Sequence, residues 1–210
     1  MAATLVVEDL ALRGVLAGAA FTVTEGEHFT VCGDGVLPLA EVLAGRRRPD
    51  SGRVTGATAV LLGAEPALFD RLTCREQLAA VAALHRRTPP DLLARVGLTD
   101  RADVREDRLT PAERHRLALA CALVAEPSVL VVAGEQPWPE VPLTLVRVTE
   151  DPLAAQDADR VLLVHGGRVL ALADPAVLVA ELAAERRLLD PGGPAPTLAD
   201  VVTRLRRRTR

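Results

Sequence analysis

The sequence predicts an α/β fold in which a parallel sheet is interrupted by a block of helices. Apolar runs of strand length occur near both ends of the chain, and helical periodicity fills residues 70–126 between them. Glycine-rich or proline-rich turns separate the segments. This order is typical of a parallel α/β core with an inserted helical subdomain. We therefore expect residues 1–210 to form a single domain that ends in a tail, residues 190–210.

The first half of the chain is expected to start with strands and to pass through a glycine-rich loop into a helix. A short apolar run ends at Gly33, and the helical run after it stops at Gly45, a good helix C-cap. The expected elements are, in order, strands at 5–12, 20–24 and 28–32, a helix at 39–44, a turn at 46–56 and a strand at 59–62.

The second half is expected to contain the helical block, then strands, then two terminal helices. Pro127 marks the end of the block, because proline cannot continue a helix. The expected elements are helices at 75–85, 91–96 and 112–124, strands at 129–132, 143–148 and 160–164, and helices at 175–187 and 198–206.

Composition and charge exclude several classes of function. The formal net charge is −3, so no global basic field indicates nucleic-acid binding, and the basic run 204–210 is expected to be a solvated terminus. Three scattered cysteines without CxxC spacing fit buried thiols in a reducing compartment. The amino-terminal residues do not resemble a signal peptide, and no apolar run is long enough to cross a membrane. A cytoplasmic protein is expected.

Several segments in the right order resemble one family. They are Gly26-Glu27, Leu43-Ala44-Gly45 with Pro49-Asp50-Ser51-Gly52, Glu65 to Phe69 with Leu72-Thr73, Arg116 to Ala120 with Glu126-Pro127, Ala158 to Val161, Gly167-Arg168-Val169, and Pro196-Thr197-Leu198 with Asp200-Val201. Together they resemble the ATPase domain of ATP-binding-cassette (ABC) transporters, and the last resembles the tail of drug-exporter-type cassettes.

The resemblance implies a fold and a setting. The fold would be a P-loop-NTPase-like parallel core with an antiparallel β subdomain at the amino terminus and a helical subdomain over residues 70–126. The protein would lie at the inner face of the cell membrane and dock on a membrane permease. It would pair with itself, or with another cassette subunit.

The resemblance places the phosphate loop at Gly33-Asp34-Gly35-Val36-Leu37-Pro38. Such a loop needs a lysine on the terminal phosphates and a hydroxyl on magnesium. Aligned on Leu43-Ala44-Gly45, Val36 takes the lysine position, and Leu37 and Pro38 take the hydroxyl positions. Aligned on Gly26-Glu27, the loop is too short. The chain contains no lysine, but arginine could have supplied the cation, so a structural glycine turn is the preferred interpretation.

The signature loop reads Thr110-Pro111-Ala112-Glu113, where the family places a serine and glycine amides against the partner's ATP. Pro111 has no N–H to donate and suits the first helical position. Thr110 and Glu113 have the spacing of a capping box. We expect a helix that satisfies its own first turn instead of binding a phosphate.

The acidic residues and the switch histidine are also replaced. Aligned on the preceding strand, Ala133 and Gly134 take the positions of the two acids; aligned on Pro137, Glu135 and Gln136 take them. In the second alignment the general base would be an amide, which cannot accept a proton. Glu150 stands at the switch histidine, and Ala64 stands at the loop glutamine. No catalytic residue, metal site or cofactor is therefore expected.

Three hypotheses follow from these losses. The preferred one is a non-catalytic cassette that keeps a permease-docking groove formed by Pro66, Leu68, Phe69 and Leu72; the alternative for this groove is packing between the two lobes. The second is a working ATPase with unorthodox ligands, in which Arg46, Arg47 or Arg48 reaches the phosphates and ATP with magnesium binds. The third is a scaffold or regulator outside transport.

Overall fold

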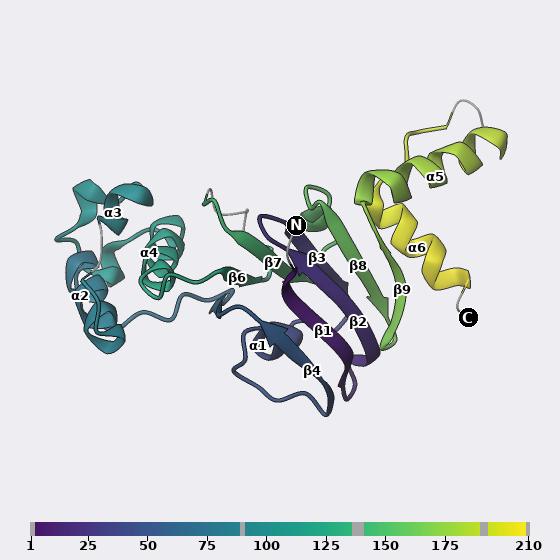
Figure 1. Cartoon of the computed structure of the whole chain (residues 1–210). Helices are drawn as coiled ribbons and strands as arrows, with labels where there is room; N and C mark the ends of the chain where they lie inside the picture. The colour runs from purple at the N-terminus through teal and green to yellow at the C-terminus, as the bar shows by residue number, and fades with distance from the viewer. Residues whose placement is uncertain (1–2, 89–90, 136–140, 190–192, 209–210) are drawn as a thin grey trace.

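Two sheets form the centre of the molecule (Figure 1), and the structure, a computed structural model, describes residues 3–88, 91–135, 141–189 and 193–208. The smaller sheet is antiparallel, in the order β2-β1-β4, and the larger has the order β5-β6-β7-β3-β8-β9. The strands of the smaller sheet are β1 (Ala3–Leu12), β2 (Leu16–Thr24) and β4 (Ser51–Gly56). Those of the larger are β3 (His28–Gly33), β5 (Ala59–Leu62), β6 (Val129–Ala133), β7 (Thr144–Thr149), β8 (Arg160–His165) and β9 (Arg168–Ala173).

The first five strands of the larger sheet are parallel, and only β9 runs antiparallel to its neighbour β8. The expected α/β class is confirmed, and so is the antiparallel subdomain. The expectation of a turn throughout 46–56 was wrong, because residues 51–56 form β4. This strand lies at the edge of its sheet and is almost wholly exposed, so it lacks the apolar alternation that marks a half-buried strand.

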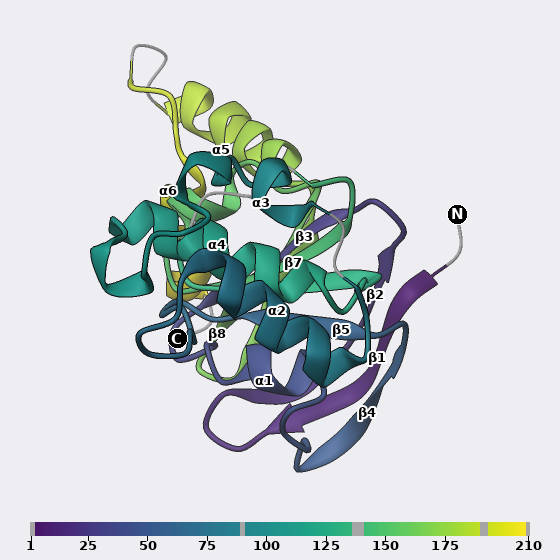
Figure 2. The ribbon, with the colours of Figure 1, turned by 90° about the vertical axis from the view of Figure 1, so that its left-hand side faces the viewer.

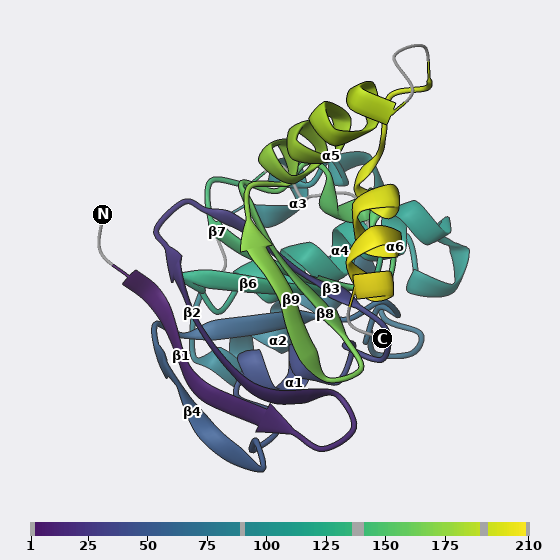
Figure 3. The ribbon, with the colours of Figure 1, turned by 90° about the vertical axis from the view of Figure 1, so that its right-hand side faces the viewer.

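The helices form separate groups around the sheets. The helical subdomain contains α2 (Cys74–His85), α3 (Leu92–Arg95), α4 (Pro111–Leu123) and the 3₁₀ turns η1 (Thr99–Arg101) and η2 (Glu106–Arg108), and Figure 2 shows these helices in front of the strands. The others are α1 (Leu39–Leu43), the 3₁₀ turn η3 (Leu153–Ala155), α5 (Pro175–Leu189) and α6 (Leu198–Arg208). Figure 3 shows α6 alongside β8 and β9.

Alternate residues of the parallel strands pack into different hydrophobic clusters on the two faces of the sheet. Val129 and Val131 of β6 pack with the antiparallel sheet and α1, whereas Leu130 and Val132 pack with the helical subdomain. Leu163 of β8 packs with α5 and α6 in a third cluster. Both faces of the sheet are therefore covered, as expected for a parallel sheet.

The three cysteines are free thiols, as the scattered spacing predicted. Burial raises the pKa of Cys32 and of Cys121 to about 12, so neither is activated as a nucleophile. Among the described residues, none of the helices is both long enough and apolar enough to span a bilayer.

Candidate nucleotide site

The loops that follow β3 and β7 meet at the carboxyl edge of the parallel sheet. This is the edge at which open α/β sheets bind ligands. Strand β3 lies between β7 and β8, with Cys32 beside Thr149 and Gly33 beside Val164. The remnant phosphate loop, residues 33–38, therefore starts next to Glu150, the first residue after β7.

Val36, the residue expected at the lysine position, points into the core. Val36 is fully buried. It belongs to the core cluster formed by the antiparallel sheet, α1 and strands β3, β6, β7 and β8. Leu37 is 39% exposed, and Pro38 precedes α1 without capping it by a side chain. The Leu39 N–H donates to the Val36 carbonyl at 2.8 Å. The loop is thus a tight turn that leads into a helix of only five residues.

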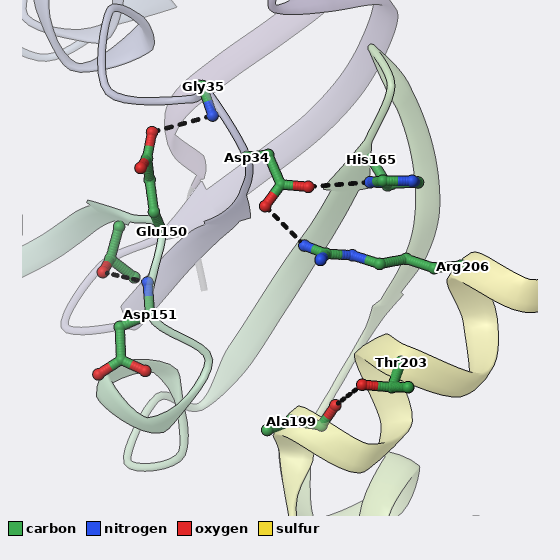
Figure 4. A network of polar contacts seen from close by, with 9 residues as sticks. Asp34, Gly35, Glu150, Asp151, His165, Ala199, Thr203 and Arg206 are labelled. Carbon is green, nitrogen blue, oxygen red and sulfur yellow. Dashed lines mark hydrogen bonds and ion pairs between the residues drawn. The ribbon is translucent and has the colours of Figure 1, made fainter.

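Acidic and basic side chains hold the exposed half of the loop (Figure 4). The Gly35 N–H donates to Oε1 of Glu150 at 2.9 Å. Asp34 accepts on one oxygen from Nη2 of Arg206 at 2.8 Å, and its other oxygen lies 3.0 Å from Nδ1 of His165. A carboxylate therefore lies on a backbone amide of the remnant phosphate loop.

The turn after β7 fixes the position of Glu150. The Asp151 N–H donates to Oγ1 of Thr149 at 3.1 Å, and the Leu153 N–H donates to Oδ1 of Asp151 at 2.9 Å. Arg147, 3% exposed, donates from Nη1 to the Ala154 carbonyl at 2.5 Å. Local hydrogen bonds on both sides of Glu150 thus orient it toward the loop.

The positions expected to carry the two acids lie on the neighbouring strand. Ala133 is the last residue of β6, and Gly134 follows it with its N–H bonded to the Val148 carbonyl at 2.8 Å. A Cβ on Gly134 would lie 3.2 Å from Cβ of Ala64, so Gly134, expected at an acid position in one of the two alignments, is a neighbour of Ala64, expected at the loop glutamine. Glu135 is exposed. Gln136 lies outside the described residues, and within them no group of three acidic, histidine or cysteine side chains could hold a metal ion.

The signature helix satisfies its own first turn, which confirms the capping box. Thr110 accepts from the Glu113 N–H at 3.3 Å, and Glu113 accepts from the Thr110 N–H at 2.8 Å. Pro111 occupies the first turn, and Pro111 and Ala112 are both exposed. Hydrogen bonds from Thr110, together with Arg101, hold the pKa of Glu113 below its ordinary value.

Two residues near this helix, Arg101 and His115, make contacts that were not predicted from the sequence. Nε of Arg101 donates to the Glu113 carboxylate at 2.9 Å and neutralises its negative charge. His115 lies 2.8 Å from the Ala64 carbonyl through Nε2 and 2.9 Å from the Pro111 carbonyl through Nδ1. His115 therefore joins α4 to Ala64, the residue expected at the loop-glutamine position.

The four docking residues differ in exposure. Phe69 is 46% exposed, whereas Pro66, Leu68 and Leu72 are half-buried, and Leu68 packs against the core of the helical subdomain. Gln77 is fully buried and binds both backbone groups of Phe69, accepting from its N–H at 3.0 Å and donating to its carbonyl at 2.5 Å. Packing against the helical subdomain accounts for Leu68, and two hydrogen bonds with Gln77 hold the backbone of Phe69, whose ring stays partly exposed.

Comparison with solved structures shows the same fold elsewhere. cbiO1 from Clostridium perfringens, part of the ABC transporter complex cbiONQ, superposes with a TM-score of 0.71 at 21% identity, over 91% of this chain and 97% of that one. A second solved structure, an ATP-binding subunit of an ABC transporter, gives a TM-score of 0.70 at 19% identity. No family model matches the sequence.

Curated relatives are closer in sequence. The aliphatic sulfonates import ATP-binding protein SsuB 1 of Mesorhizobium japonicum is 31% identical in an alignment that covers 74% of this chain and 71% of the relative. The chain belongs to the ATP-binding-cassette family. Another relative of this cassette is the sulfate/thiosulfate import ATP-binding protein CysA of Synechococcus elongatus, 30% identical over 69% of the chain. A third is the Nod factor export ATP-binding protein I of Rhizobium sp., 30% identical over 80%.

Only some properties of these relatives can be assigned to this cassette. It spans 53% of the CysA relative and 68% of the Nod factor relative, so their whole-protein activities do not follow for it. Their names include both import and export, so they do not fix a direction. The tail that resembles exporters has a structural role here, because Thr197 accepts from the Asp200 N–H at 3.4 Å and caps α6.

Proposed function

We propose that this cassette is a non-catalytic subunit of an exporter-type ABC transporter and needs neither ATP nor magnesium. The observation that carries the proposal is the hydrogen bond between the Gly35 N–H and Glu150. Phosphate loops bind anions through such amides. In this chain a carboxylate of the protein takes up the amide, and no side-chain cation of the loop remains to draw a nucleotide in.

Electrostatics and geometry both disfavour nucleotide binding at this loop. A γ-phosphate brought to the Gly35 N–H would lie beside the carboxylate of Glu150, and like charges at short range repel. Val36 is enclosed by apolar side chains, so the lysine position does not face the site. The first amides of α1 are bonded inside the turn, for example from Ala40 to the Leu37 carbonyl at 3.0 Å.

The arrangement does not favour the second hypothesis, an ATPase with arginine ligands. Arg46, Arg47 and Arg48 follow the carboxyl end of α1, whereas the remnant loop precedes its amino end. Arg47 and Arg48 line a cavity of about 320 Å³ formed with β4 and the start of β5. They lie at the opposite end of α1 from Gly35.

The proposed partner is a membrane permease, and the proposed docking anchor is Phe69. An exposed aromatic ring on a segment fixed by Gln77 costs little conformational entropy on binding, which is typical of anchor residues. The cassette would then lie at the inner face of the cell membrane. It would pair with itself or with another cassette through protein contacts that do not require ATP.

Docking is tested by replacing Phe69. We expect Phe69→Ser to lower recovery of a co-expressed partner permease at least tenfold, since an aromatic anchor contributes roughly 2 kcal/mol or more. Quantitative mass spectrometry of the detergent-extracted complex measures the recovery. Leu84→Ser is the matched control, because Leu84 is also apolar and is 73% exposed on α2. Undiminished recovery with Phe69→Ser would remove Phe69 from the docking surface.

A further inference from the structure

The remnant phosphate loop is held from two opposite sides at consecutive residues (Figure 4). On one side, Gly35 is bonded to Glu150, which follows β7. On the other side, Asp34 meets Arg206 of α6 and His165 of β8, at 2.8 Å and 3.0 Å. Asp34 and Arg206 are 172 residues apart in the chain, so this contact joins the remnant loop to the end of the described structure.

Helix α6 is anchored unevenly along its length. Its first two turns are buried through Leu198, Val201 and Val202, which pack with Leu163 of β8 in the third core cluster. Thr197 and Asp200 cap the start of the helix. The amino-terminal part of α6 is therefore held by the core independently of the contacts made by its carboxyl-terminal turns.

The last turns of α6 contact the third core cluster through Leu205 and also carry charged side chains that pair with neighbouring elements. Arg204 and Arg208 pair with Glu185 of α5, and Arg206 pairs with Asp34 of the loop. Arg207 is exposed. The ion pair of Arg206 with Asp34 thus connects α6 to the loop, whereas those of Arg204 and Arg208 connect it to α5.

We infer that α6 is a latch, closed by Arg206 on Asp34, which keeps the remnant loop in the conformation in which Gly35 binds Glu150. Because the two contacts act on adjacent residues, opening one loosens the other. The end of α6 and the loop then each stabilise the closed conformation of the other. A partner that displaces α6 would release the loop. Such coupling is reciprocal between the two sites. The inference goes beyond the proposed function and does not depend on a permease.

The readout must be local, because partly exposed ion pairs contribute little to global stability. Hydrogen–deuterium exchange of the full chain, followed by mass spectrometry, reports local opening of the loop peptide 33–40 and of the helix peptide 203–208. We expect Arg206→Gln to speed exchange in the loop peptide roughly three- to fivefold, the factor of a partly exposed pair. Asp34→Asn should have the same effect on the helix peptide, far away in sequence.

Two controls make the result decisive. Arg207→Gln removes a neighbouring exposed charge from the same helix and should leave the loop peptide unchanged. The effect of the double variant Asp34→Asn with Arg206→Gln should be smaller than the sum of the two single effects, because both substitutions break the contact between Asp34 and Arg206. Faster exchange in α6 alone for Arg206→Gln, equal effects of Arg207→Gln, or additive effects in the double variant would each overturn the latch. None of these outcomes depends on ATP or permease binding, so the latch and the proposed function fail separately.

Discussion

The Val36→Lys variant should lose at least about 2 kcal/mol of unfolding free energy and should not gain ATPase activity. The substitution restores the family's lysine at the position that the sequence aligns with it. Val36, however, is fully buried among apolar side chains of the core. A lysine at this position either buries an ammonium group without a partner or forces the turn open. Urea unfolding and a phosphate-release assay measure the two expectations.

The neighbouring position supplies the control for this variant. Leu37 is 39% exposed, so a lysine there can keep its charge in water, and Leu37→Lys should change stability by less than about 0.5 kcal/mol. Residues that act as a unit in catalysis are not additive, so a single lysine without magnesium ligands and a base should give no turnover. A stable, ATP-hydrolysing Val36→Lys protein would show that the site is intact apart from one residue.

The Gly33→Ala variant should be destabilised by about 3 kcal/mol, because the position has no room for a side chain. A Cβ on Gly33 would lie 2.1 Å from the Val164 carbonyl oxygen and 2.9 Å from its carbon. These are backbone atoms of β8 that pair with β3, so relief would require breaking the central sheet. Thermal and urea unfolding measure the loss.

Gly35→Ala is the matched control from the same loop. Gly35 has a φ of 68°, and an added Cβ would meet nothing within 4 Å, so only the left-handed backbone disfavours alanine, at a cost of about 1 kcal/mol. The contrast separates a glycine required for strand packing from one required for a turn. If Gly35→Ala proved as damaging as Gly33→Ala, the close approach to Val164 would not be the reason that glycine is needed.

Local sequence signals predicted the elements of this cassette better than its site. The capping box of Thr110 and Glu113 depends on residues three apart, so spacing alone was sufficient to predict it. The parallel strands were found because they are short apolar runs buried on both faces. The edge strand β4 was missed, because its exposed residues are polar and small.

The contacts that close the site could not be predicted in this way. Asp34 and Arg206 meet only because α6 returns to the carboxyl edge of the sheet, and nothing in either segment indicates the other. The burial of Val36 depends on how the turn enters α1, which alignment to a lysine position does not show. Glu150 appeared from the sequence to be only a missing histidine, whereas the structure gives it a hydrogen bond to Gly35.

Isothermal titration of the purified chain with magnesium-ATP tests the central claim most directly. The hydrogen bond from Gly35 to Glu150 and the buried Val36 predict no saturable heat and no binding tighter than about 1 mM. Saturable binding in the micromolar range that disappears when magnesium is removed would contradict the account, and it would show that the remnant loop still receives a nucleotide.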